Sequence, residues 1–221
     1  MIQAVIFDLD GTILDNEENW EKAFVAVAHK HQITNPKLQM PNGWIHEPGL
    51  GLSANWKRMI TDPVKAEMLA RDTWVTYHKI FKEGMEELKL RDGVAELIEK
   101  IRNRGWRVGL STGSTWNVVE PELEQLKLYM AFDVTTTGEE VMVTKPDPEI
   151  YILTAQKLET DPEFCLVIED AIAGIRAGAE AGCQVVGLES AYASGKEMLA
   201  AGAGFAVKNI SEIENLFKNF E

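Results

Sequence analysis

Residues 4–12 read Ala-Val-Ile-Phe-Asp-Leu-Asp-Gly-Thr, an apolar run that stops at two carboxylates and a glycine. The four apolar residues at 4–7 predict a short strand that is buried on both faces, as in a parallel sheet. Gly11 lets the chain turn sharply directly after this strand. We therefore expect Asp8 and Asp10 to lie beyond the carboxyl end of the strand, where open α/β sheets bind their ligands.

Short apolar runs and longer helical patterns alternate through the rest of the chain. The runs predict further strands at 106–110, 132–136, 164–168, 184–188 and 205–207. Apolar residues at helical spacing predict helices at 94–104, 116–128, 148–158, 171–181 and 210–220. Alternation of this kind implies parallel strands with right-handed crossovers. The expected fold class is therefore α/β, with a Rossmann-like parallel sheet at its core.

Residues 15–89 interrupt the alternation. Helical patterns without a convincing strand occur there at 17–31, 55–60 and 63–83. We therefore predict an all-helical domain of residues 15–89, inserted into a core domain of residues 1–14 and 90–221. The insertion contains 11 acidic and 10 basic residues, whereas the whole chain has a net charge of −13. The insertion is thus the part of the molecule that repels an anionic ligand less.

The composition excludes several classes of protein. Apolar residues make up 45% and charged residues 26% of the 221 residues, which indicates a globular chain with a buried core. The acidic balance argues against binding to nucleic acid, because such surfaces need an excess of Lys and Arg. We find no signal peptide and no membrane span, so we expect a cytoplasmic protein that does not bind membranes. Cys165 and Cys183 lie in apolar stretches and are expected to be buried thiols rather than a disulfide.

Three more of the predicted strand ends carry polar residues. Residues 111–114, Ser-Thr-Gly-Ser, offer hydroxyl and backbone N–H groups ahead of a helix, which can bind an anion or merely cap the helix. Lys145 precedes Pro146, which favours an extended backbone at the lysine, although a lone lysine is usually a surface charge. Glu169 and Asp170 follow a buried strand, where solubility does not require carboxylates.

The two carboxylates after the first strand repel each other unless a cation or a proton offsets their charge. Mg²⁺ prefers oxygen ligands of this type. The sequence Asp-x-Asp-Gly is also common in simple turns, so alone it favours neither interpretation. Carboxylates, hydroxyls and an ammonium at four strand ends of one sheet favour a ligand site.

In this arrangement the chain resembles the haloacid dehalogenase superfamily, whose four motifs occur in order. The matching segments are residues 8–12 (Asp-Leu-Asp-Gly-Thr), 111–113 (Ser-Thr-Gly), 145–146 (Lys-Pro) and 169–170 (Glu-Asp). The resemblance covers residues 1–14 and 90–221. The helical insertion resembles the type-1 cap of that family.

The resemblance implies a role for each of these residues. Asp8 would be the nucleophile that forms an aspartyl-phosphate, and Asp10 would be the general acid and base. Ser111, Thr112 and Lys145 would bind the phosphate of the substrate. The ligands of Mg²⁺ would be Asp8, Asp10 through its carbonyl group, Glu169 and Asp170.

The most similar subgroup contains sugar-phosphate phosphatases and β-phosphoglucomutase, which share this core. A mutase needs a second, cationic phosphate clamp in the cap, and the segment 49–56 contains no cation before Lys57 and Arg58. We therefore expect a Mg²⁺-dependent phosphatase that hydrolyses a sugar or polyol phosphate, with a phosphosugar mutase as the alternative. The expected partner is this small phosphorylated metabolite, and the chain would be a monomer or a weak homodimer.

Aromatic residues of the insertion are candidates for specificity. Trp44 and His46 lie in a loop rich in Gly and Pro and could contact the substrate. Trp20, Trp56 and Trp74 occupy helical positions and are expected to form the core of the cap itself. A relative that binds phosphate without catalysis is a third possibility, but the four intact motifs do not favour it.

Overall fold

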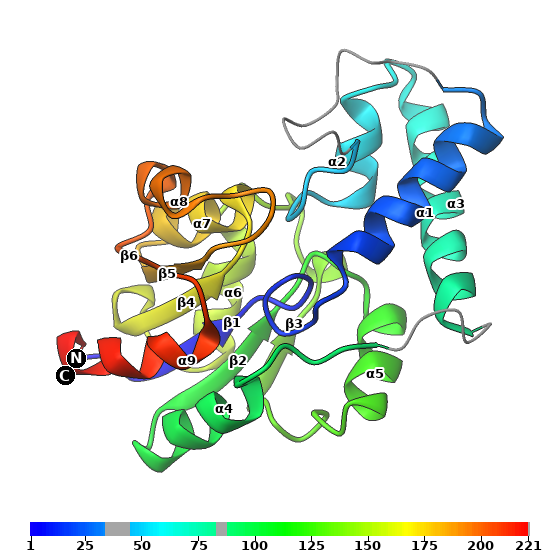
Figure 1. The fold of residues 1–221 in the computed structure, drawn as a ribbon. Coiled ribbons are helices and arrows are strands. Elements are labelled where there is room, and N and C mark those ends of the chain that lie inside the picture. The colour runs from blue at the N-terminus through cyan, green and yellow to red at the C-terminus, as the bar shows by residue number, and fades with distance from the viewer. Residues whose placement is uncertain (34–44, 83–87, 221) are drawn as a thin grey trace.

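The structure, a computed structural model, describes residues 1–33, 45–82 and 88–220 (Figure 1). Its six strands are β1 (Ala4–Phe7), β2 (Arg107–Ser111), β3 (Val134–Thr136), β4 (Cys165–Glu169), β5 (Gln184–Leu188) and β6 (Phe205–Val207). They form one sheet in the order β3-β2-β1-β4-β5-β6, in which every neighbouring pair is parallel. The predicted α/β fold class with a Rossmann-like sheet is confirmed.

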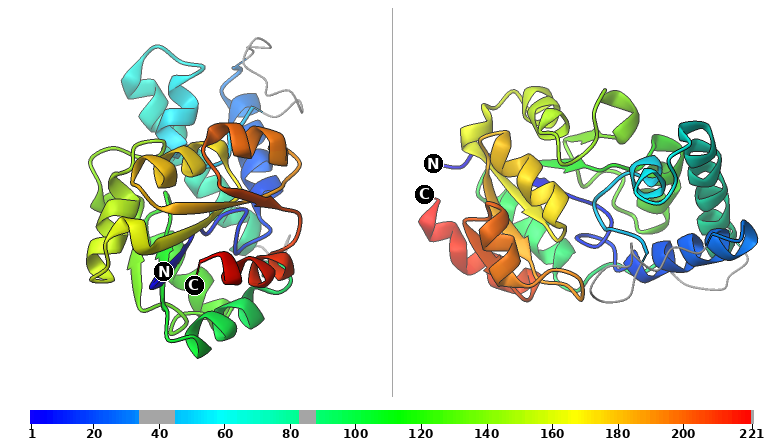
Figure 2. Two further views of the ribbon diagram at one scale, coloured as in Figure 1. Left: turned by 90° about the vertical axis from the view of Figure 1, so that its left-hand side faces the viewer. Right: turned by 90° about the horizontal axis from the view of Figure 1, so that it is seen from above.

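Helices cover both faces of the sheet (Figure 2). One face packs against α4 (Val94–Asn103), α5 (Trp116–Gln125), α9 (Ile210–Ile213) and the 3₁₀ turn Glu214–Asn219. The other face packs against α6 (Glu149–Lys157), α7 (Ile172–Glu180) and α8 (Gly195–Ala201). Val5 and Phe7 belong to the first cluster and Ala4 and Ile6 to the second, so β1 must be apolar throughout.

Three helices, α1 (Glu17–Lys30), α2 (Leu52–Lys57) and α3 (Pro63–Lys82), pack on one another beyond the carboxyl end of the sheet (Figure 1). We call them the cap helices. Phe24, Trp56 and Leu69 are fully buried between them. The division into a core of residues 1–14 and 90–221 and a cap domain of residues 15–89 stays a prediction.

The two connections between the sheet and the cap helices run side by side. Leu14 pairs with Leu90 in an antiparallel bridge. The backbone N–H of Asp15 donates to the carbonyl of Lys89 at 2.9 Å. The chain therefore leaves the sheet for the cap helices and returns from them at the same place. This place lies close to the carboxylates that follow β1.

Three helices differ from the sequence-based prediction. The helix expected at 55–60 is α2 at Leu52–Lys57, and the helix expected at 210–220 is divided into α9 and the 3₁₀ turn Glu214–Asn219. Helix α8 was not predicted, because the segment 195–204 is rich in Ala and Gly and has little apolar periodicity. Its start is fixed by a capping box, in which Ser194 and Glu197 bond to each other's backbone N–H groups.

Cys165 and Cys183 are buried free thiols, as predicted. Among the described residues, no helix has the length and apolar character of a membrane span.

Matched substitutions test the assignment of β4 to the centre of the sheet. Leu166 of β4 is fully buried, whereas Leu199 of α8 is about half exposed. Leu166→Ala should lower the free energy of unfolding by about 2–5 kcal/mol, because it leaves a cavity in the core. Leu199→Ala should lower it by less than about 0.5 kcal/mol. Urea unfolding followed by tryptophan fluorescence measures both, and equal losses would contradict the fold.

Candidate active site

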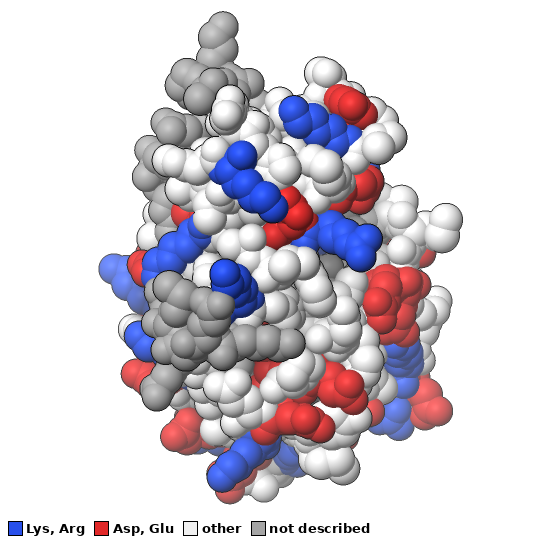
Figure 3. Space-filling model, turned by 90° about the vertical axis from the view of Figure 1, so that its right-hand side faces the viewer, with Lys and Arg blue, Asp and Glu red and all other residues white. Residues whose placement is uncertain are grey.

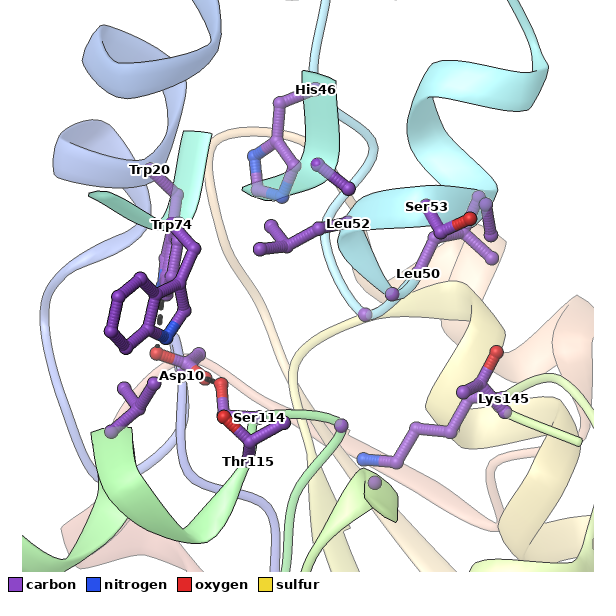
Figure 4. A pocket seen from close by; sticks show the side chains of 18 of the residues that line it. Asp10, Trp20, His46, Leu50, Leu52, Ser53, Trp74, Ser114, Thr115 and Lys145 are labelled. Atoms are coloured by element: carbon purple, nitrogen blue, oxygen red, sulfur yellow. Dashed lines mark hydrogen bonds between the residues drawn. The ribbon is translucent and has the colours of Figure 1, made fainter. Parts of the chain in front are cut away.

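A cavity of about 500 Å³ lies between the carboxyl edge of the sheet and the cap helices (Figure 4). The core contributes Asp8, Asp10, Ser114 and Lys145 to its wall, and the region of the cap helices contributes Glu17, Trp20, His46 and Trp74. The carboxyl ends of parallel strands meet at this edge, so residues far apart in the sequence converge here. Three of the four predicted motif segments reach the cavity directly, through Asp8 and Asp10, Gly113, and Lys145.

Lys145 binds two carboxylates at once. Its Nζ atom donates to Asp8 Oδ1 and to Glu169 Oε1, each at 2.6 Å, and its side chain is almost fully buried. Burial alone would lower the pKa of Lys145, but the two carboxylates outweigh this effect and hold the pKa above its ordinary value. Lys145 is therefore an ammonium at neutral pH. Glu169 is held further by Tyr151, whose hydroxyl donates to Oε1 at 2.9 Å.

Asp8, Glu169 and Asp170 form a buried acidic cluster. One oxygen atom from each lies within 4.8 Å of the others. Burial, followed by repulsion from Glu169, raises the pKa of Asp8 well above its usual range and that of Asp170 to about 7. When all three carboxylates are ionised, the single positive charge of Lys145 does not balance them. Carboxylate oxygens are ligands that suit a divalent cation. These described residues therefore have the chemistry of a metal site.

The carboxylate of Asp10 lies apart from this cluster and points toward the cap helices. Its Oδ1 accepts hydrogen bonds from Asn16 Nδ2 at 2.6 Å and from Trp20 Nε1 at 2.8 Å. Its Oδ2 accepts from the hydroxyl of Ser114 at 2.9 Å. Three donors fix the orientation of this carboxylate, and Trp20 in turn is stacked on Tyr77 with a ring separation of 3.5 Å. A cap helix is thus bonded directly to one of the two carboxylates that follow β1.

The two hydroxyl residues at the end of β2 are not among the described residues that line the cavity. Ser111 and Thr112 are both fully buried. Thr112 Oγ1 accepts from the backbone N–H of Ser114 at 3.1 Å. Among the described residues of this segment, Gly113 and Ser114 line the cavity. A role of Ser111 and Thr112 in binding phosphate stays a prediction.

The predicted specificity residues have different outcomes. Trp44 lies outside the described residues. His46 lines the cavity, and its ring stacks on Phe24 at 4.9 Å. Trp20 is buried, as predicted for the cap core, but its indole N–H also reaches Asp10, and Trp74 lines the cavity too.

Sequence reasoning did not identify Glu17 as a residue of the site. It is the first residue of α1, is buried, and lines the cavity. Its spacing of three residues from Trp20 places both side chains on one face of the helix. This spacing is the one feature of the sequence that could have linked Glu17 to the site. That this face turns toward the cavity depends on how α1 packs against α3.

Lys57 and Arg58, the cations that follow segment 49–56, form ion pairs with carboxylates. Lys57 pairs with Glu67 at 3.0 Å and Arg58 with Glu47 at 3.2 Å. Among the described residues that line the cavity, the cations are Lys145 and Arg71 of α3. The cation that the cap helices contribute to the cavity is therefore Arg71, which the sequence analysis did not identify.

On the outer face around the cap helices, charged side chains of both signs are interspersed (Figure 3).

The acidic cluster predicts a pH-dependent response to Mg²⁺. Since the pKa of Asp170 is raised from 3.8 to about 7, the ion-free folded protein binds more protons than the unfolded chain, and its stability should fall as pH rises through this window. Added Mg²⁺ should raise Tm by roughly 3 °C or more, and more at about pH 8 than at about pH 6, because bound carboxylates must be ionised. Asp170→Asn should abolish this Mg²⁺ response, and Asp92→Asn, at an exposed carboxylate, should keep it. A thermal-shift titration with an equal response in all three proteins would contradict the site.

Comparison with known proteins identifies the family. The family model of haloacid dehalogenase-like hydrolases matches residues 2–182. A phosphorylated carbohydrates phosphatase from Thermotoga maritima is 31% identical over 226 residues, which cover 98% of this chain and 99% of the relative. Hexitol phosphatase B from Escherichia coli strain K12 is 27% identical over 185 residues, which cover 79% of this chain and 78% of the relative.

A solved structure from this group of proteins has a similar fold. The crystal structure of CbbY from Rhodobacter sphaeroides in complex with phosphate has a TM-score of 0.78 and 25% identity, and the match covers 96% of each chain. The match of the family model spans β1 to α7 and includes all four motif segments. The chain belongs to the haloacid dehalogenase-like hydrolases.

Proposed function

We propose that this protein is a Mg²⁺-dependent phosphatase that hydrolyses a small sugar or polyol phosphate through an aspartyl-phosphate on Asp8. The observation that carries this proposal is the position of Asp8. It lines the cavity, belongs to the acidic cluster with Glu169 and Asp170, and accepts a hydrogen bond from Lys145 at 2.6 Å. A nucleophilic carboxylate that must approach a phosphate dianion needs such compensation of charge.

The relatives support the substrate class. Two of them are named as phosphatases of phosphorylated carbohydrates and of hexitols. The cavity also fits a metabolite of this size, since about 500 Å³ accommodates a small ligand and excludes a folded partner. We therefore assign the substrate to the polyhydroxylated phosphate monoesters.

The proposed reaction has two steps. In the first, a carboxylate oxygen of Asp8 bonds to phosphorus, the ester P–O bond breaks, and Asp10 gives a proton to the leaving oxygen. In the second, Asp10 removes a proton from water, the water oxygen bonds to phosphorus, and the bond to Asp8 breaks. Phosphate leaves, and both aspartates return to their starting protonation states. Lys145 stabilises the negative charge beside Asp8 throughout.

Asp8, Glu169, Asp170 and the carbonyl group of Asp10 would hold Mg²⁺. The bound ion would neutralise the phosphoryl oxygens and polarise the phosphorus toward attack. The side chain of Asp10 would not take part in metal binding, because three protein donors already hold it in place. This leaves its carboxylate to the acid and base role.

A phosphosugar mutase is the second candidate, and Arg71 is the observation that favours it. A mutase must hold a bisphosphate, and Arg71 offers a cation at the cap side of the cavity. Lys57 and Arg58 are engaged by Glu67 and Glu47, so they are poor candidates for such a clamp. A conversion assay with hexose 1-phosphates and a trace of the bisphosphate separates the two functions. Isomerisation faster than phosphate release would favour the mutase.

Phosphate release from a panel of sugar, polyol, nucleotide and small-acid phosphates tests the proposal, with Mg²⁺ or with chelator. We expect Mg²⁺-dependent release that is greatest for sugar or polyol phosphates. Asp8→Asn should lower kcat by roughly 10⁴-fold or more, because the nucleophile is lost. Asp15→Asn, at an exposed carboxylate seven residues along the chain, should keep the activity. Native melting with substantial turnover in Asp8→Asn would remove Asp8 as nucleophile.

The bond from Trp20 to Asp10 predicts an effect on kcat. Trp20→Phe keeps a ring to stack on Tyr77 but removes the N–H group that orients Asp10. We expect kcat to fall by about 10-fold with a smaller change in KM, because proton transfer depends on this orientation. Trp74→Phe makes the same change at a tryptophan that lines the same cavity and should alter KM more than kcat. Equal losses of kcat in the two variants would show that the Trp20 bond has no special role.

A further inference from the structure

Glu17 is a buried carboxyl group that the proposed reaction does not use. It is 6% exposed and lines the same cavity as Asp8 and Lys145. Its Oε2 atom has no hydrogen-bond partner among the described residues. A buried polar atom without a partner destabilises the folded protein, so a ligand atom that bonds to it would remove this cost.

His46 presents a second atom of this kind, directly beside the first. It is 4% exposed, and its Nδ1 atom also lacks a hydrogen-bond partner among the described residues. Nδ1 lies 3.4 Å from Glu17 Oε2. The ring is fixed in place, because it stacks on Phe24 and because the backbone N–H of His46 donates to Glu21 Oε2 at 3.0 Å. The two atoms therefore form a buried polar pair, in which the position of the imidazole is fixed.

Burial disfavours the charged form of both groups in this pair. Burial, followed by repulsion from Asp170 and then from Asp10, raises the pKa of Glu17 well above its usual range. Burial, with a smaller contribution from Arg58, lowers the pKa of His46 to about 3. In its uncharged form the pair combines a carboxylic acid that can donate a hydrogen bond with an imidazole nitrogen that can accept one.

The chemistry of the pair selects among ligand groups. A hydroxyl group both accepts and donates, so it can bond to the acid and to the imidazole at the same time. An ammonium group has no lone pair with which to accept a hydrogen bond from the carboxylic acid. A carboxylate has no proton with which to donate a hydrogen bond to the imidazole. A second anion would also be repelled by the acidic cluster. The complementary group is therefore a neutral alcohol.

We propose that Glu17 and His46 form a subsite that binds a hydroxyl group of the leaving alcohol and so select polyhydroxylated phosphate esters over unsubstituted ones. Figure 4 shows His46 on the cap side of the cavity, across from Asp10 and Lys145. The phosphoryl group would lie at the core end and the hydroxylated carbon chain at the cap end. This inference rests on the proposed phosphatase function.

Two esters of equal chain length provide the test. Erythritol 4-phosphate carries hydroxyl groups on its other carbons, and n-butyl phosphate carries none. The measured quantity is the ratio of kcat/KM for the first ester to kcat/KM for the second, in the presence of Mg²⁺. The wild-type ratio should exceed about 10, because a site built to bond a hydroxyl rejects an analogue that lacks it.

Substitutions at Glu17 should change this ratio in a defined order. Glu17→Met keeps the length of the side chain but removes its hydrogen bonds, and should lower the ratio by about 10-fold or more. Glu17→Gln keeps a neutral donor and acceptor, and should hold the ratio within about threefold of the wild-type value. Glu18→Met makes the first change at the exposed neighbouring residue and should leave the ratio as it is. His46→Phe keeps a ring on Phe24 and should resemble Glu17→Met; it serves as the second variant if Glu17→Met does not fold.

Each other outcome overturns a specific statement. A ratio that is the same in wild type, Glu17→Met and His46→Phe, with native melting, would show that the pair does not bind substrate. A ratio lost in Glu17→Gln as in Glu17→Met would show that an ionised carboxylate acts instead, as would faster hydrolysis of ethanolamine phosphate than of erythritol 4-phosphate. If wild type hydrolyses no ester of the wider panel, the proposed phosphatase function fails, and this inference fails with it.

Discussion

The ammonium of Lys145 holds together a site that would otherwise be electrostatically unstable. The parallel register pairs Phe7 of β1 with Ile168 of β4, so Asp8 and Glu169 follow side by side. No choice of side-chain conformation can separate them far, because both begin at the edge of the same sheet. Lys145 bridges the two carboxylates at 2.6 Å and remains charged for that reason. The negative charge that Lys145 does not offset makes this cluster suited to a divalent cation.

Much of the core could be predicted because local sequence and global topology agree there. The bounds of β1, β5 and β6 match the predicted apolar runs to the residue, since each run is buried and ends at polar or turn-forming residues. The convergence of Asp8, Lys145, Glu169 and Asp170 followed from one rule, that parallel strands present their carboxyl ends on one edge. That rule holds wherever alternating strands and helices are recognised, and it requires no knowledge of side-chain packing.

The cap side of the cavity could not be predicted in this way. An amphipathic helix shows which residues share a face, but not which partner that face meets. Trp20 reaches Asp10 because α1 packs against α3, where Tyr77 supplies a stacking surface 57 positions away in sequence. Glu17 and His46 meet for the same reason, from segments with no local relation. The resulting cavity has Asp8 and Lys145 at its sheet end and the buried side chains of Glu17 and His46 under the cap helices.

Phosphorylation of Asp8 itself tests the account most directly. Acetyl phosphate is a suitable donor, because its leaving group needs no proton from Asp10. With Mg²⁺ and the Asp10→Asn variant, which lacks the base that activates water, a phosphoryl group should accumulate on the protein. Mass spectrometry of the quenched protein should place it on Asp8, and hydroxylamine should release it. Steady release of phosphate without any protein-bound phosphoryl group, or phosphorylation at another residue, would contradict the proposed mechanism.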